Sequence, residues 1–189
     1  MNANSHVFIG LMLIATLAGC KKDEEMPPPP AANEEEVITT MVLRFLSTSG
    51  GADKELRFTD ADGDGGNAPV LTLDTLDAAT GYDVSIFLLN ESTSPTDTIS
   101  HEVLDEGVLH QFFFAITGVD LSVAYADTDA NGQPIGLSTM MTTGVAGSGN
   151  LRVTLRHMPN KDAAGVAGGD ITNAGGETDI EVDLPMVVE

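Results

Sequence analysis

The chain has 189 residues, a net charge of −21 and a single cysteine. The charge opposes binding to nucleic-acid phosphates, and one cysteine excludes a disulfide within the chain. With 42% hydrophobic residues, the chain can bury the core of one domain of ordinary size.

The N-terminus has the features of an export signal. Residues 7–18 form an apolar run too short to span a bilayer comfortably, although residues 1–6 contain no Lys or Arg. The run ends in Leu17-Ala18-Gly19-Cys20, which resembles the bacterial lipobox. The sequence therefore predicts a lipoprotein signal peptide over residues 1–19 and lipidation of Cys20. The alternative is an ordinary signal peptide, or a short buried helix with a chance cysteine.

An acidic, proline-rich linker is predicted over residues 20–36. The prolines Pro27–Pro30 favour a stiff extended spacer, and Glu34–Glu36 continues the polar segment. Lys21 to Glu25 resembles the surface-export signal of Bacteroidota lipoproteins, or is simply a solvated charge run. We therefore expect a cell-envelope protein anchored by lipid to the outer membrane, with surface exposure left open.

A β-rich domain is predicted over residues 37–189. In its first half, segments rich in β-branched residues or with alternating apolar residues predict strands at 37–47, 54–59, 70–73 and 82–89. Residues 98–106 are ambiguous, because Ile99 and Val103 have helical spacing whereas Ile99, His101 and Val103 have strand spacing. We favour a strand that pairs back onto residues 82–90.

The second half continues the same pattern. Strands are predicted at 110–116, 121–125, 151–157 and 180–184, and Phe112-Phe113-Phe114 suggests a central strand buried on both sides. Residues 163–176 are rich in Gly and Ala and predict a mobile loop. Eight or nine short strands without long helices favour an all-β fold, an antiparallel β-sandwich of Ig-like architecture.

The mature chain also resembles a known group of proteins. The resemblance is carried by residues 60–66, by Glu102, Glu106 and His110-Gln111-Phe112-Phe113, and by residues 127–137, 151–159 and 178–182. The group is a set of uncharacterised Bacteroidota lipoproteins, often named type 1 periplasmic binding fold proteins. The resemblance implies export and a lipid anchor, but no activity or site residues. The repeated strand–helix–strand units of a two-lobed binding protein are missing here, so the sandwich remains the expected fold.

Two acidic segments could bind calcium. Asp60, Asp62 and Asp64, and later Asp127, Asp129 and Asn131, both fit D-x-[DN]-x-[DN]-G, the start of an EF-hand loop. The bidentate Glu at position twelve is missing, since Leu71 and Ser138 stand there. These segments therefore predict either a structural calcium site between strands or plain Asx turns at hairpin tips.

A second set of residues could bind zinc or copper. Glu102, Glu106 and His110 are spaced by four, so they share one face of a helix or one face of a strand. His157 and His101 are candidates to join them. Imidazole and carboxylate groups together suit these metals, although a solvated acidic strand with one ordinary histidine gives the same pattern.

No catalytic motif stands out along the chain. Ser148 lies in Gly147-Ser148-Gly149, which is not the strand–elbow–helix form of a hydrolase, and Cys20 is expected to be lipidated. The sequence favours a non-enzymatic module that binds a protein or small-molecule ligand and that calcium stabilises. A metal-handling protein is the alternative, and a hydrolase that uses acidic residues is the third hypothesis.

Overall fold

The computed structural model describes residues 36–63 and 66–189. The described residues all belong to the C-terminal compact unit of the chain, Glu35–Glu189. The predicted signal peptide, Cys20, most of the predicted linker and Asp64 lie outside the described residues. Among the described residues, no helix is long and apolar enough to cross a membrane.

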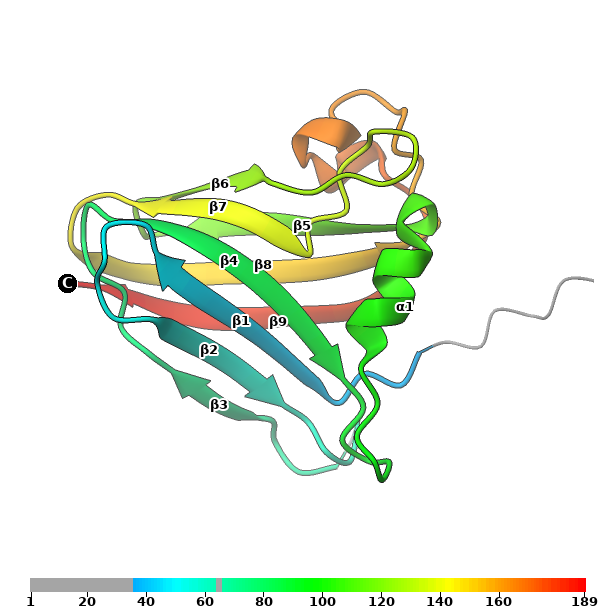
Figure 1. Cartoon of the computed structure of the whole chain (residues 1–189), viewed down its shortest axis with the longest axis horizontal. Helices are drawn as coiled ribbons and strands as arrows, with labels where there is room; N and C mark the ends of the chain where they lie inside the picture. The colour runs from blue at the N-terminus through cyan, green and yellow to red at the C-terminus, as the bar shows by residue number, and fades with distance from the viewer. Residues whose placement is uncertain (1–35, 64–65) are drawn as a thin grey trace, which may run out of the picture. The chain divides into compact units, whose positions relative to one another are not determined.

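The domain is an antiparallel β-sandwich of two sheets (Figure 1). The large sheet has the strand order β3-β2-β1-β4-β7-β6, and the small sheet has the order β5-β8-β9. The strands of the large sheet are β1 (Thr40–Ser47), β2 (Lys54–Thr59), β3 (Val70–Leu73), β4 (Gly81–Leu89), β6 (Leu121–Tyr125) and β7 (Ser138–Thr143). Those of the small sheet are β5 (His110–Thr117), β8 (Gly147–His157) and β9 (Glu177–Val188).

The core lies between the two sheets and is built by alternate residues of each strand. On β1 the inward residues Met41, Leu43 and Phe45 are fully buried, and Phe45 meets Tyr82 edge to face with ring centroids 5.7 Å apart. On β9 the alternation runs through Val182, Leu184 and Met186 to Val188. Burying every second side chain in this way is what the alternating sequence predicts, so the expected sandwich is confirmed.

One strand of the large sheet, β7, was not predicted from the sequence. β7 (Ser138–Thr143) buries Thr139, Met141 and Thr143 and leaves Met140 exposed. Its inward residues are therefore mostly threonines, which do not mark an apolar face in the sequence. Thr143 instead satisfies its hydroxyl by bonding the Asp77 carbonyl at 2.7 Å.

The prediction of a strand at residues 98–106 was wrong. Ile99–Asp105 form the short helix α1, followed by a 3₁₀ turn, Gly107–Leu109. Ile99 and Val103 are buried, as the helical spacing indicated. The hydroxyl of Ser100 accepts a hydrogen bond from the Leu88 amide at 2.9 Å and bonds its carbonyl at 3.3 Å. These are the groups of β4 that a pairing strand would have used.

The placement of Phe112-Phe113-Phe114 in a central strand was also wrong. β5 pairs only with β8 and forms an edge of the small sheet. Burial on both faces still holds for its first part: Phe112 enters the core, and Phe113 lies under Val166 and Ala174. The segment 163–176 contains 3₁₀ turns at Val166–Gly168 and Ile171–Asn173 and covers this outer face. The Gln111 amide donates to the Val166 carbonyl at 2.8 Å, which ties the segment to β5.

Candidate metal centre

Five ionisable side chains meet at the end of the sandwich where β8 ends and β9 begins. They come from separate parts of the chain: the segment before β1, the C-terminal cap of α1, the first residue of β5, the last residue of β8 and the start of β9. Within two overlapping groups of three, one ligand atom from each residue lies within 4.8 Å of the others. We call this set the histidine cluster: Glu36, Glu106, His110, His157 and Asp179.

Strand register places the two histidines side by side. In the β5–β8 pair His110 lies directly opposite His157, and their ring centroids are 4.7 Å apart. Opposite residues of antiparallel strands bring their side chains together on one face of the sheet. Gly176, with a left-handed φ of +69°, lets the chain pass close to the His157 carbonyl, where a Cβ would clash.

A β-bulge turns Asp179 into the cluster. Leu155 pairs with Ile180 but Arg156 pairs with Thr178, so Asp179 is the extra residue of β9. A bulge changes the side to which the following side chains point. The Asp179 side chain is consequently only 6% exposed.

Three ion-pair distances within the cluster exceed hydrogen-bond length but suit ligands that share an ion. His110 Nε2 lies 3.8 Å from Glu36 Oε1 and 3.7 Å from Asp179 Oδ2, and His157 Nδ1 lies 3.7 Å from Asp179 Oδ1. Two ligands of a tetrahedral zinc ion, each about 2 Å from the metal, lie roughly 3.3 Å apart. Small shifts of the side chains would therefore bring these atoms into zinc coordination.

His110 is the most constrained member of the cluster. Its side chain is fully buried, its Nδ1 lies 3.2 Å from the Glu106 carbonyl oxygen, and its Nε2 has no hydrogen-bond partner among the described residues. If Nδ1 carries the proton and donates it to that carbonyl, Nε2 is left with a lone pair aimed at Glu36 and Asp179. A metal-binding imidazole usually donates the proton of its other ring nitrogen to a carbonyl or carboxylate in this way.

The electrostatics of the cluster favour a bound cation. Burial, and then the negative charges of Asp179, Glu102 and Glu106, raise the pKa of Glu36 to about 7. Burial lowers the pKa of His110, so the imidazole does not supply a positive charge at neutral pH. A divalent cation would offset part of the negative charge that the carboxylates of the cluster bring together.

A pocket of about 400 Å³ adjoins the cluster between the two sheets. Glu36 and Asp179 belong both to the cluster and to the wall of this pocket. The remaining wall comes from the segment before β1, the end of β2 and the start of β9: Ile38, Phe58, Asp60, Gly63, Thr178, Ile180 and Glu181.

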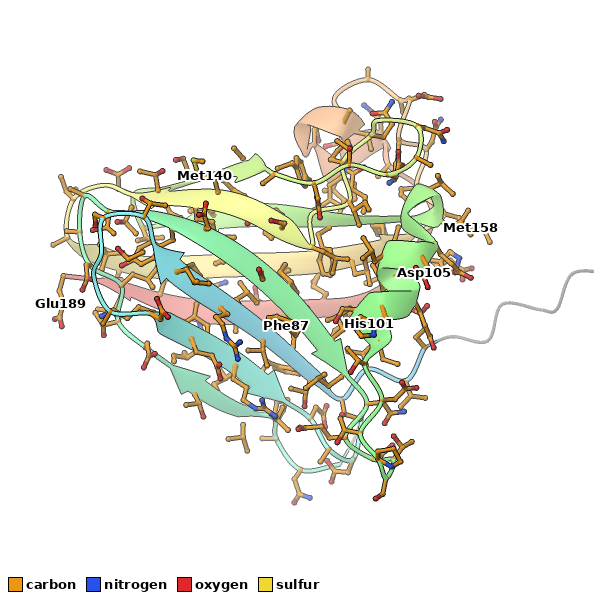
Figure 2. All side chains as sticks on the ribbon, viewed as in Figure 1. Phe87, His101, Asp105, Met140, Met158 and Glu189 are labelled. Atoms are coloured by element: carbon orange, nitrogen blue, oxygen red, sulfur yellow. The ribbon has the colours of Figure 1, made fainter. Side chains whose placement is uncertain are left out.

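The structure brings some residues of the predicted zinc or copper site close together. Glu106 and His110 meet, and His157 joins them as the sequence suggested. Glu102, exposed on α1, contributes its charge to Glu36 but is not among the clustered ligands. His101 is exposed on the same helix (Figure 2) and is not among the clustered ligands.

Sequence reasoning missed Glu36 and Asp179. Glu36 was assigned to the linker because it closes an acidic run, and no pattern distinguishes it from its neighbours. Asp179 was missed because the alternation of apolar and polar residues along a strand does not reveal a β-bulge. The polar residues that precede the last apolar strand were the only available signal.

The second of the predicted calcium loops is fully bonded within the protein. The Asp127 carboxylate accepts bonds from the amides of Gly136 and Ser138 at 2.7 and 2.8 Å. Asp129 accepts from two backbone amides with one oxygen and pairs with Lys161 Nζ at 2.9 Å with the other. The buried ammonium of Lys161 pairs with this carboxylate, and Asn131 is exposed. Calcium binding at Asp127, Asp129 and Asn131 stays a prediction.

The first loop resembles an ordinary Asx turn. Asp60 accepts from the Gly63 amide at 3.0 Å, and Asp62 accepts from the backbone and side-chain amides of Asn67 at 2.9 and 2.7 Å. Asp64 lies outside the described residues. Calcium binding at Asp60, Asp62 and Asp64 thus stays a prediction.

No protein-family model matches this chain, and no curated protein or solved structure matches it. The resemblance to Bacteroidota lipoproteins therefore also stays a prediction. The function must be argued from the histidine cluster and from the sequence.

Proposed function

We propose that this chain is a lipid-anchored cell-envelope protein whose β-sandwich binds one transition-metal ion, such as zinc or copper(II), at the histidine cluster. The observation that carries the proposal is the buried imidazole of His110. Its Nε2 has no hydrogen-bond partner among the described residues and faces two carboxylates at 3.7–3.8 Å.

The donor set selects the class of metal. Calcium and magnesium prefer cages of oxygen ligands, whereas zinc and copper(II) combine imidazole nitrogen with carboxylate oxygen. His110, His157 and Asp179 supply two nitrogens and one oxygen, and Glu36 or Glu106 adds a further oxygen. No thiolate is available, because Cys20 is the only cysteine of the chain.

A metal ion bound at the histidine cluster would link the two sheets and stabilise the sandwich. Glu36 lies just before β1 of the large sheet, while His110, His157 and Asp179 each lie on a strand of the small sheet. Coordination would therefore join the two layers at one end. Binding to the folded state alone raises stability with the logarithm of metal concentration.

The lipid anchor is the other half of the proposal and is supported by the sequence. An apolar run followed by Leu-Ala-Gly-Cys predicts acylation of Cys20, and the Pro-rich segment predicts a spacer between membrane and domain. A non-enzymatic, metal-binding module at the envelope surface is consistent with the lack of a nucleophile motif.

Zinc binding is tested by calorimetry and elemental analysis on the chelator-treated mature chain. We expect one zinc ion per chain, a higher melting temperature with zinc and little change with calcium. His110→Ala should lower zinc affinity at least tenfold, because it removes the ligand shared by both groups of donors.

His101→Ala is the matched control, since that histidine is exposed on α1 and outside the cluster. It should bind zinc as the parent protein does. Equal zinc binding by the parent and His110→Ala proteins would contradict the proposal. A calcium-specific rise in melting temperature, lost on Asp62→Ala, would instead favour the calcium hypothesis.

A further inference from the structure

The pocket contacts the histidine cluster on one side only. Glu36 and Asp179 line the pocket, whereas His110, His157 and Glu106 do not. The two imidazoles reach the cluster from the buried side, with side-chain exposures of 0% and 8%. Protein ligands therefore surround a metal ion on its inner side, and the pocket lies on its outer side.

Closed structural zinc sites differ from open zinc sites in whether every ligand comes from the protein. A structural site has all four ligands from the protein, whereas an open site keeps a position for water or an added ligand. Here the pocket holds about 400 Å³, enough space beside the carboxylate ligands for a small organic molecule.

The pocket wall indicates which ligands fit. Ile38, Phe58 and Ile180 provide apolar surface, and the hydroxyl of Thr178 is nearby. Asp60 and Glu181 add negative charge, which disfavours an anionic ligand. An uncharged donor atom on an apolar body suits these surroundings best.

We propose that the metal ion at the histidine cluster keeps one exchangeable position facing this pocket, and that it binds there a small ligand with a neutral nitrogen donor and an apolar body. The inference rests on the proposed function, since the ligand is held through the metal. It extends that function from metal binding to recognition of imidazole-like or amine-like compounds.

Cobalt(II) substitution gives a direct test, because the visible absorption of cobalt reports a change of ligand. The mature chain is loaded with cobalt and titrated with imidazole, 4-phenylimidazole and benzoate. We expect saturable spectral changes with both imidazoles while cobalt stays on the protein after desalting. The phenyl compound should bind about tenfold more tightly, since its ring buries apolar surface. Benzoate should leave the spectrum unchanged.

Variants at Phe58 test whether the pocket supplies the apolar contact. Phe58→Ala should retain cobalt but lose the preference for 4-phenylimidazole, and Phe58→Leu, which keeps more of the core filled, should retain part of it. Phe87→Ala is the matched control, because Phe87 is on β4, stacks under Arg44 and does not line the pocket (Figure 2).

The possible failures are distinguishable. Bound cobalt with a spectrum that no imidazole changes would overturn this inference and leave the proposed function intact. The same holds for benzoate binding as tightly as 4-phenylimidazole. A protein that takes up no cobalt or zinc at all would overturn both.

Discussion

At the residue scale, the buried ammonium of Lys161 pairs with the carboxylate of Asp129. Its ammonium donates to the carbonyl oxygens of Gly107 and Pro134 at 2.6 and 2.9 Å and pairs with Asp129, whose side chain is 1% exposed. Lys161→Met should lower the free energy of unfolding by about 3–5 kcal/mol, because it leaves a buried carboxylate without a positive partner. Urea denaturation measures this change.

The exposed pair Arg44–Glu55, at 3.7 Å, provides the comparison. Arg44→Met should cost under about 1 kcal/mol, since water and salt screen such pairs. Adding Asp129→Asn to Lys161→Met should recover part of the lost stability. A Lys161→Met protein as stable as the parent would show that Asp129 does not depend on the ammonium.

The raised pKa of Glu36 predicts that the stability of the metal-free protein depends on pH. Burial and neighbouring negative charge raise its pKa to about 7 from a usual value of 4.5, so the folded state binds a proton more tightly than the unfolded chain. This stabilisation is lost as pH rises through 7. Burial lowers the pKa of His110, which opposes stability only below its usual value of 6.5.

The contribution of Glu36 is measured as the difference between the urea midpoints of the parent and Glu36→Gln proteins, both with chelator, because the glutamine amide does not titrate. We expect this difference to change as pH rises from about 5 to about 7 and to stay constant above pH 7. A difference that does not change over this range would contradict the assignment of the raised pKa to Glu36.

At the element scale, Ser100 joins α1 to the end of β4. Ser100, which is 7% exposed, bonds both backbone groups of Leu88 at the end of β4. Ser100→Ala would leave these buried groups without the hydroxyl and should cost about 1–3 kcal/mol of unfolding free energy. Ser122→Ala, on the exposed side of β6, should change stability by less than about 0.5 kcal/mol. Equal effects of the two substitutions would show that α1 is held by other contacts.

The elements also show how far the sequence could predict the structure. Alternation placed most strands, because burial of one face imposes a period of two on the side chains. The seven residues of α1 are too few to separate a helix from a strand by spacing, and the contact of Ser100 with Leu88 decides between them. Glu106, His110 and His157 could be proposed together from residue type alone. Asp179 depends on a bulge, and Glu36 depends on the path of the chain before β1, which no local pattern encodes.

At the scale of the whole molecule, we propose a lipid anchor at Cys20 followed by a metal-binding sandwich. The anchor predicts that a bacterial host incorporates labelled palmitate into the protein, and that the protein fractionates with membranes. Cys20→Ser should abolish labelling and release the protein into the soluble fraction, since an acyl chain contributes about 0.8 kcal/mol per buried methylene. An unlabelled parent protein recovered from the cytoplasm would contradict export and acylation.

The central claim is that the histidine cluster coordinates a transition-metal ion with two imidazoles. X-ray absorption at the zinc edge, on the zinc-loaded mature chain, tests it most directly. We predict nitrogen and oxygen ligands at about 2.0–2.1 Å with the scattering pattern of two imidazole rings, reduced to one ring in His157→Ala. A shell made only of oxygen ligands, or the same pattern in the parent and His157→Ala proteins, would contradict the account.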